Sequence, residues 1–133
     1  MKKAVLLLGH GSTEAEANSD MFQIIELLRQ RTDYIVEAGF LELNPPDIQV
    51  GIDHCVEHGA TEILMIPYFL HLGAHVRHDL PNEMAEGRKR YPEVEFKMGG
   101  HLGFHRLLAD IVLDRIREAG WDVEGDRRSG QAL

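Results

Sequence analysis

Two short apolar runs constrain the fold of this chain more than any other feature. They cover Ala4–Leu8 and Ile63–Ile66 and contain no charged residue. Gly9 follows the first run and Pro67 follows the second. A strand without polar positions must be buried on both faces, as happens in a parallel sheet that is covered by helices. The two runs therefore predict the central strands of an α/β fold.

Two further apolar segments carry charges and are predicted to be edge strands. Tyr34–Phe40 includes Glu37, and Val94–Met98 alternates apolar and charged residues. Edge strands tolerate charge because one side of the strand faces solvent. Helical patterns separate the four segments, and crossovers between parallel strands are right-handed. We therefore predict a four-stranded parallel sheet in the order 2-1-3-4, with helices on both faces.

The spacing of apolar side chains and the residues at segment ends predict the helices. Thr13 starts a capping-box pattern ahead of the first helix. Asn44 followed by Pro45 is typical of an N-cap and a first helical residue. We expect the third helix from near Asp79 to about Arg90, and a last helix over Leu107–Ile116.

Composition limits the kind of protein that this chain can be. The 133 residues suit one domain, and 44% of them are hydrophobic. A net charge of −8 argues against binding to a nucleic acid backbone, and the lone Cys55 excludes an internal disulfide. No apolar run approaches the roughly 20 residues of a membrane span. We predict a cytoplasmic protein with one domain over residues 1–121 and a polar, disordered tail over residues 122–133.

Histidines follow both predicted central strands. Ligands of open α/β sheets bind beyond the carboxyl ends of the strands, where the strand order reverses, and here that point lies between the first and third strands. The loop after the first strand carries His10 between two glycines. A neutral imidazole there suits a metal ligand or a general base, whereas the alternative role is capping of the next helix.

Other candidate residues surround this point in the predicted topology. The segment Tyr68–His78 is predicted to be a loop that contains three histidines, because Gly73 disfavours an ordered helix there. Each of these histidines is either a metal ligand or a solvated side chain. Glu42 follows the second strand and either contacts a ligand or is a surface carboxylate. The roles of four histidines stay open: His71, His78, His101 and His105.

Common nucleotide and hydrolase motifs are missing from the sequence. The Gly9-His10-Gly11 turn lacks the third glycine of a dinucleotide fingerprint, since position 14 is Glu. No phosphate-binding loop ends in Gly-Lys-Ser or Gly-Lys-Thr, and no Gly-x-Ser-x-Gly elbow is present.

The motifs resemble those of the class II tetrapyrrole chelatases over about residues 3–118. Leu7–Ser12 is similar to the opening motif of that family. Its second motif is similar to three successive segments of this chain, Pro67–Leu70, Gly73–Arg77 and Asp79–Pro81. Gly100–Gly103 resembles a third, looser one. The length matches the small, single-domain sirohydrochlorin chelatases of cobalamin synthesis, whose longer relatives contain two such domains.

The resemblance implies a chelatase-like fold and insertion of Co²⁺ into sirohydrochlorin, with no permanently bound cofactor. It implies His10 and His75 as metal ligands, with His10 also accepting a proton, and Glu42 in contact with the substrate. It also implies a homodimer. Because the substrate carries many carboxylates, binding needs local cations such as Arg77 or Arg106, or backbone N–H groups at helix starts. The stretch implied to line the tetrapyrrole is Leu70, His71, Leu72, Gly73, Ala74 and His75.

Three alternatives remain open from the sequence. Fe²⁺ or Ni²⁺ can replace Co²⁺, since the same ligands suit all three ions. A non-enzymatic metal-handling protein would bind metal without binding a tetrapyrrole. A histidine phosphatase would use His10 as its nucleophile, but such chemistry needs an arginine directly before the histidine, and here that residue is Gly9.

Overall fold

The computed structural model describes residues 2–123, in which four strands alternate with four helices. The chain forms two compact units that divide after Leu102. The predicted tail over residues 122–133 lies, except for its first two residues, outside the described part, and the predicted domain boundaries stay a prediction. The strands are β1 (Lys3–Gly9), β2 (Ile35–Phe40), β3 (Glu62–Pro67) and β4 (Glu95–Met98), and the helices are α1 (Ala15–Arg31), α2 (Ile48–Glu57), α3 (Ala74–Arg90) and α4 (Leu107–Glu118).

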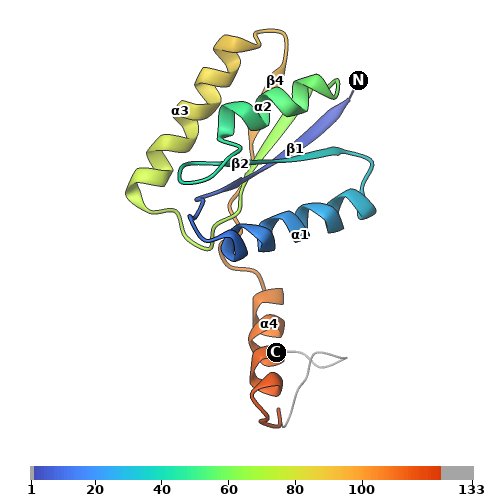
Figure 1. Cartoon of the computed structure of the whole chain (residues 1–133), viewed down its shortest axis with the longest axis vertical. Helices are drawn as coiled ribbons and strands as arrows, with labels where there is room; N and C mark the ends of the chain where they lie inside the picture. The colour runs from blue at the N-terminus through green and yellow to red at the C-terminus, as the bar shows by residue number, and fades with distance from the viewer. Residues whose placement is uncertain (1, 124–133) are drawn as a thin grey trace. The chain divides into compact units, whose positions relative to one another are not determined.

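The sheet confirms the predicted topology. The strand order is β2-β1-β3-β4, and every neighbouring pair is parallel. The register places Leu8 opposite both Gly39 and Pro67, so β1, β2 and β3 end at the same edge of the sheet (Figure 1). The segments that follow these three strands therefore start side by side, which is the arrangement that brings His10 and Glu42 together.

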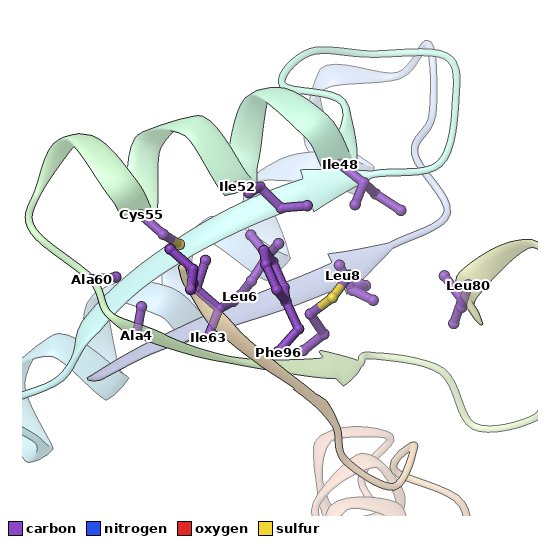
Figure 2. Close-up of a cluster of buried hydrophobic side chains, with 12 residues drawn as sticks. Ala4, Leu6, Leu8, Ile48, Ile52, Cys55, Ala60, Ile63, Leu80 and Phe96 are labelled. Carbon is purple, nitrogen blue, oxygen red and sulfur yellow. The ribbon is translucent and has the colours of Figure 1, made fainter. Parts of the chain in front are cut away.

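Apolar side chains fill both faces of the sheet. On one face, α2 and α3 pack over the central strands, with Leu6, Ile52 and Ile63 fully buried (Figure 2). On the other face, α1 contributes Met21 and Ile25. The first charge-free strand, β1, is thus covered on both sides. The second, β3, was also predicted to be buried on both faces, but its buried residues alternate with partly buried ones. This rigid base supports the loops at the carboxyl edge.

Helix α3 begins five residues earlier than the predicted start near Asp79, so the prediction of a loop through His78 was wrong. Gly73 is the N-cap residue, and the Arg77 N–H donates to its carbonyl at 2.9 Å. The glycine that was expected to prevent a helix lies just outside it, in an extended conformation that suits a cap. His75 and His78 consequently lie on a helix.

Both predicted N-caps were also wrong. Helix α1 has Glu14 at its N-cap with no side-chain cap bond, while the Ser12 hydroxyl accepts the Glu14 N–H at 3.0 Å. Helix α2 is capped by Asp47, whose carboxylate accepts the Val50 N–H at 2.8 Å. The Phe40 N–H donates to the Pro46 carbonyl at 2.8 Å, so the chain stays beside the sheet until residue 46 and the helix starts later than predicted.

The second unit contains α4, which confirms the predicted last helix. Its N-cap residue, Arg106, makes no side-chain cap bond, and its last turn closes through the Gly120 N–H, which donates to the Arg117 carbonyl at 2.9 Å. Gly120 has a φ of 89°, a conformation that glycine adopts readily at helix ends. Throughout residues 2–123, no helix is long and apolar enough to cross a membrane.

Candidate metal centre

The loops that follow β1 and β2 continue the pairing of their strands. The Leu41 N–H donates to the Gly9 carbonyl at 2.9 Å, and the Glu42 N–H donates to the His10 carbonyl at 3.1 Å. These bonds carry the parallel ladder past the last strand residues. As a result, the two loops hold His10 and Glu42 next to each other without a long connecting segment.

Gly11 is required for this close approach. Its φ is +97°, and a Cβ built at this position would lie 1.8 Å from the Glu42 carbonyl oxygen. Non-bonded carbon and oxygen atoms cannot approach so closely, so no other residue fits here without moving the loop. The glycines on both sides of His10 were expected to allow a sharp turn, and Gly11 has that role.

His10 and Glu42 form the central pair of the site. His10 Nε2 lies 3.1 Å from Glu42 Oε1, and the two side chains are 53% and 59% exposed. At this exposure, solvent screens the pair, so its contribution to folding stability is small. The arrangement instead leaves one imidazole nitrogen and one carboxylate beside open solvent, a donor set that suits a borderline-soft divalent cation.

The segment between β3 and α3 supplies the other predicted residues. Leu70 and His71 are exposed, whereas Leu72 is partly buried and packs against the larger core cluster. Ala74 and His75 are the first two residues of α3, and both are exposed. Backbone N–H groups in the first turn of a helix have no partner within the helix and attract anionic groups.

The structure places His10, one of the two predicted metal ligands, beside Glu42, which was predicted to contact substrate. Within the described range of the chain, no three His, Cys, Asp or Glu side chains lie where they could hold one metal ion. His10 therefore pairs with Glu42, while the role of His75 as a ligand stays a prediction. His101 is half-buried in the first unit. His105 belongs to the second unit, where its Nδ1 accepts the Leu107 N–H at 3.2 Å.

Sequence reasoning missed two features of this site. Glu42 was expected either to contact a ligand or to be a surface carboxylate, and its position beside His10 was not foreseen. Asn44 was assigned to a helix cap, but its Oδ1 accepts the Ser12 N–H at 2.9 Å, across the two loops. The available signal was the strand order itself, because parallel neighbours place their following loops together.

An open groove of about 900 Å³ adjoins the pair on the side of α2. Glu42 forms part of its wall, so the groove and the His10–Glu42 pair share one carboxylate. Most of the other lining side chains are apolar, which suits the flat face of an organic ligand. The groove is lined by Leu41, Glu42, Leu43, Asn44, Pro45, Pro46, Asp47, Val50 and His54.

Comparison with known proteins identifies the family. The model of the CbiX family matches residues 4–119. The chain belongs to the CbiX family. Among curated proteins, this CbiX chain is 38% identical to a sirohydrochlorin ferrochelatase of Priestia megaterium, over 92% of this chain and 47% of that protein. It is 31% identical to a sirohydrochlorin cobaltochelatase of Methanococcoides burtonii, over 88% of this chain and 96% of that protein.

Solved structures agree with this membership. The CbiX chain is similar to the sirohydrochlorin chelatase SirB from Bacillus subtilis in complex with cobalt, with a TM-score of 0.82 and 34% identity. The similarity covers 89% of this chain and 51% of SirB. The CbiX chain therefore spans about half the length of its larger relatives and nearly the whole of the short archaeal one.

Proposed function

We propose that this CbiX protein is a chelatase that inserts Co²⁺ into sirohydrochlorin. The observation that carries the proposal is the exposed pair of His10 Nε2 and Glu42 Oε1, 3.1 Å apart beyond the ends of β1 and β2. The short relative from Methanococcoides, which is named a sirohydrochlorin cobaltochelatase, supports the choice of substrate and metal.

The proposed reaction exchanges one divalent cation for two protons. Sirohydrochlorin loses two pyrrole N–H protons, and the metal forms bonds to the four ring nitrogens. In the proposal, His10 and His75 bind the incoming ion. As the ion passes to the ring nitrogens, the freed neutral His10 accepts one of the two protons and solvent water accepts the other. The Glu42 carboxylate beside His10 offers a further oxygen to the ion and stabilises the imidazolium that proton transfer creates. The ion itself is a substrate of the reaction, and no permanently bound cofactor is part of the proposal.

The segment after β3 is proposed to bind the tetrapyrrole. Leu70 is exposed and offers apolar surface to a flat ring. Anionic substituents of the ring would be attracted by Arg77 and by the free N–H groups at the start of α3. This local attraction is needed because the chain as a whole carries a net charge of −8. The proposed contacts are Glu42, Leu70, His71, Leu72, Gly73, Ala74 and His75.

Iron is the second candidate metal. A similar protein from Priestia megaterium is named a ferrochelatase, and a SirB structure that matches 92% of this chain contains Fe³⁺. Imidazole and carboxylate donors bind Fe²⁺, Co²⁺ and Ni²⁺, so the donor types do not distinguish between these ions. Rates with each metal decide the question.

The proposal also includes a homodimer in the cytoplasm. The chain covers about half of its larger relatives, so two copies supply the same amount of structure as one long chain. A second copy would then complete the walls of the substrate site.

An anaerobic absorbance time course tests the proposed reaction. Sirohydrochlorin and Co²⁺ are mixed with and without the protein, and then with Fe²⁺ or Ni²⁺ in place of Co²⁺. We expect the protein to accelerate the change to the spectrum of the cobalt product. Acceleration with none of the three metals would overturn the proposal and favour a metal-handling protein.

Variants of the two proposed ligands test the site itself. His10→Ala and His75→Ala are each expected to lower the rate at least about a hundredfold, since each removes a donor to the ion or a proton acceptor. His58→Ala is the matched control: His58 is an exposed histidine at the end of α2, and its Nδ1 lies 2.7 Å from the His54 carbonyl oxygen. A rate close to wild type in His10→Ala would contradict the assigned role.

A further inference from the structure

Asn44 is placed where it connects the two loops of the metal centre. Its Oδ1 accepts the Ser12 N–H at 2.9 Å, a contact between residues 32 positions apart in the sequence. Its own N–H donates to the Glu42 carbonyl at 2.9 Å. Asn44 therefore forms hydrogen bonds both to the loop that carries His10 and to Glu42, the residue that contacts His10.

The turn that these bonds hold is an unfavourable one. The bond from the Asn44 N–H to the Glu42 carbonyl closes a three-residue turn with Leu43 at its centre, and Leu43 has a φ of 74°. A branched side chain rarely adopts this conformation, and it persists only where surrounding contacts enforce it. Leu43 is 58% exposed, so its side-chain packing does not enforce the turn.

The side chain of Asn44 is not used for capping a helix, because Asp47 caps α2. The second bond of its amide group is local, from Nδ2 to the Pro45 carbonyl at 3.1 Å. The Oδ1 contact with Ser12 is thus the side-chain bond that joins the strained turn to the opposite loop. Gly11 lies close to this bond, because a Cβ built on Gly11 would be 2.7 Å from Asn44 Oδ1.

We propose that Asn44 is a positioning residue that holds the Glu42 carboxylate against His10. It acts through the Ser12 backbone and through the turn at Leu43, and it does not itself bind the metal. The consequence for metal binding rests on the function proposed above. Without the Oδ1 acceptor the turn relaxes, and Glu42 no longer stays within 3.1 Å of His10.

Amide hydrogen exchange tests the positioning without any use of activity. In Asn44→Ala, the Ser12 and Glu42 amides are expected to exchange at least about tenfold faster than in the wild type, while amides inside α2 keep their rates. Asn44→Asp retains an oxygen acceptor and is expected to restore the slow exchange at Ser12. Unchanged exchange at both amides in Asn44→Ala would overturn the proposal, even if the protein proves to be an active chelatase.

Calorimetric titration with Co²⁺ tests the link from Asn44 to Glu42. Asn44→Ala is expected to weaken Co²⁺ binding roughly fivefold in the wild-type background. In the Glu42→Gln background, the same change is expected to have no further effect, because residues that act through one another are not additive. An equal loss in both backgrounds would show that Asn44 does not act through Glu42 and would overturn the proposal.

Gln49→Ala is the matched control for both measurements. Gln49 also connects two segments through its amide, since its Nε2 donates to the Glu83 carbonyl at 2.9 Å and to Glu83 Oε1 at 2.8 Å. It lies outside the metal centre, so Co²⁺ affinity is expected to stay at the wild-type value. A loss equal to that of Asn44→Ala would attribute the effect to general loosening of the fold. If wild-type protein binds Co²⁺ but metallates no sirohydrochlorin, the proposed function fails while the positioning role of Asn44 stands.

Discussion

At the scale of single residues, the candidate metal centre depends on a glycine as much as on its polar groups. Gly11 lets the loop after β1 lie against the Glu42 carbonyl. The His10–Glu42 pair exists only because the two backbones are this close. A change of one methyl group at Gly11 is therefore expected to disturb the site more than most changes of exposed side chains.

Gly11→Ala is expected to destabilise the fold by about 2 kcal/mol or more and to weaken Co²⁺ binding at least about tenfold. The cause is the overlap of the new Cβ with the Glu42 oxygen, added to the strain of a φ of +97°. Urea denaturation and calorimetric titration give the two quantities.

Gly120→Ala separates the two causes. Gly120 also has a positive φ, of +89°, but among residues 2–123 nothing lies within 4 Å of an added Cβ. We expect a loss of about 1 kcal/mol from the conformational strain and no loss of Co²⁺ affinity. Equal effects of the two substitutions on Co²⁺ binding would show that close approach at Gly11 is unimportant.

Cys55 illustrates how burial changes the chemistry of a residue. Burial raises the pKa of its thiol to about 12, with a smaller contribution from the negative charge of Glu37. The folded state therefore keeps the thiol proton at pH values where an unfolded chain releases it. This contribution to stability is fully present below pH 9.0 and is lost as the pH rises toward about 12.

Native Cys55 is expected to react with a thiol reagent at pH 8 far more slowly than the unfolded chain. The thiolate is the reactive form, and burial raises the pKa of the thiol well above pH 8. A spectrophotometric thiol assay with and without denaturant measures the difference in rate. Rapid labelling of the folded protein would show that Cys55 is accessible and that this face of α2 opens readily.

At the scale of secondary structure elements, close packing of α2 on the sheet outweighs helix propensity. Gly51 lies in the interior of α2, and a Cβ there would lie 2.4 Å from the Ala38 carbonyl oxygen and 2.9 Å from Leu6 Cδ1. Propensity alone favours alanine over glycine by about 1 kcal/mol. Overlap with a backbone atom cannot be relieved by rotating a side chain, so packing is the larger effect.

Gly51→Ala is accordingly expected to lower the free energy of unfolding by about 2 kcal/mol, in spite of the better helix former. Gly87→Ala in α3 is the comparison, because its added Cβ would meet Ile52 Cδ1 at 2.9 Å and atoms of the Phe96 ring from 3.1 Å, all in side chains. Those groups can shift, so we expect a change within about 1 kcal/mol. Urea denaturation of both variants measures which one loses more free energy of unfolding. A stabilised Gly51→Ala would contradict the prediction.

At the scale of the whole molecule, the half-length of the chain is the feature with the largest consequence. Its larger relatives are about twice as long, whereas the Methanococcoides relative is matched over 96% of its length. Within residues 2–123, the short chain offers the His10–Glu42 pair with an open groove beside it. In the proposed dimer, a second copy would supply a further wall of the site.

The proposed homodimer predicts a mass in solution of about 30 kDa, twice the 15.1 kDa of one chain. Light scattering coupled to size-exclusion chromatography measures this mass. A mass that stays near 15.1 kDa at micromolar concentration and above would contradict the dimer. The measurement is independent of activity, so it tests the assembly separately from the chemistry.

The sequence alone determined the class of fold, the strand order and the edge of the sheet that carries the site. Charge-free runs such as Ala4–Leu8 must be buried on both faces, and this requirement acts within each segment. Strand order followed from which segments carry charge and from the handedness of crossovers. The position of His10 beyond a central strand followed from the same local pattern.

Only the tertiary structure decided which residues meet. The sequence placed three helix starts wrongly: the N-caps at Glu14 and Asp47 and the early start of α3. It did not predict the contact between His10 and Glu42. A local pattern shows that a side chain such as that of Asn44 can accept a backbone N–H, but several donors lie within its reach. The choice of Ser12, 32 residues away, follows from the register of β1 and β2, and that register is set by packing across the whole sheet.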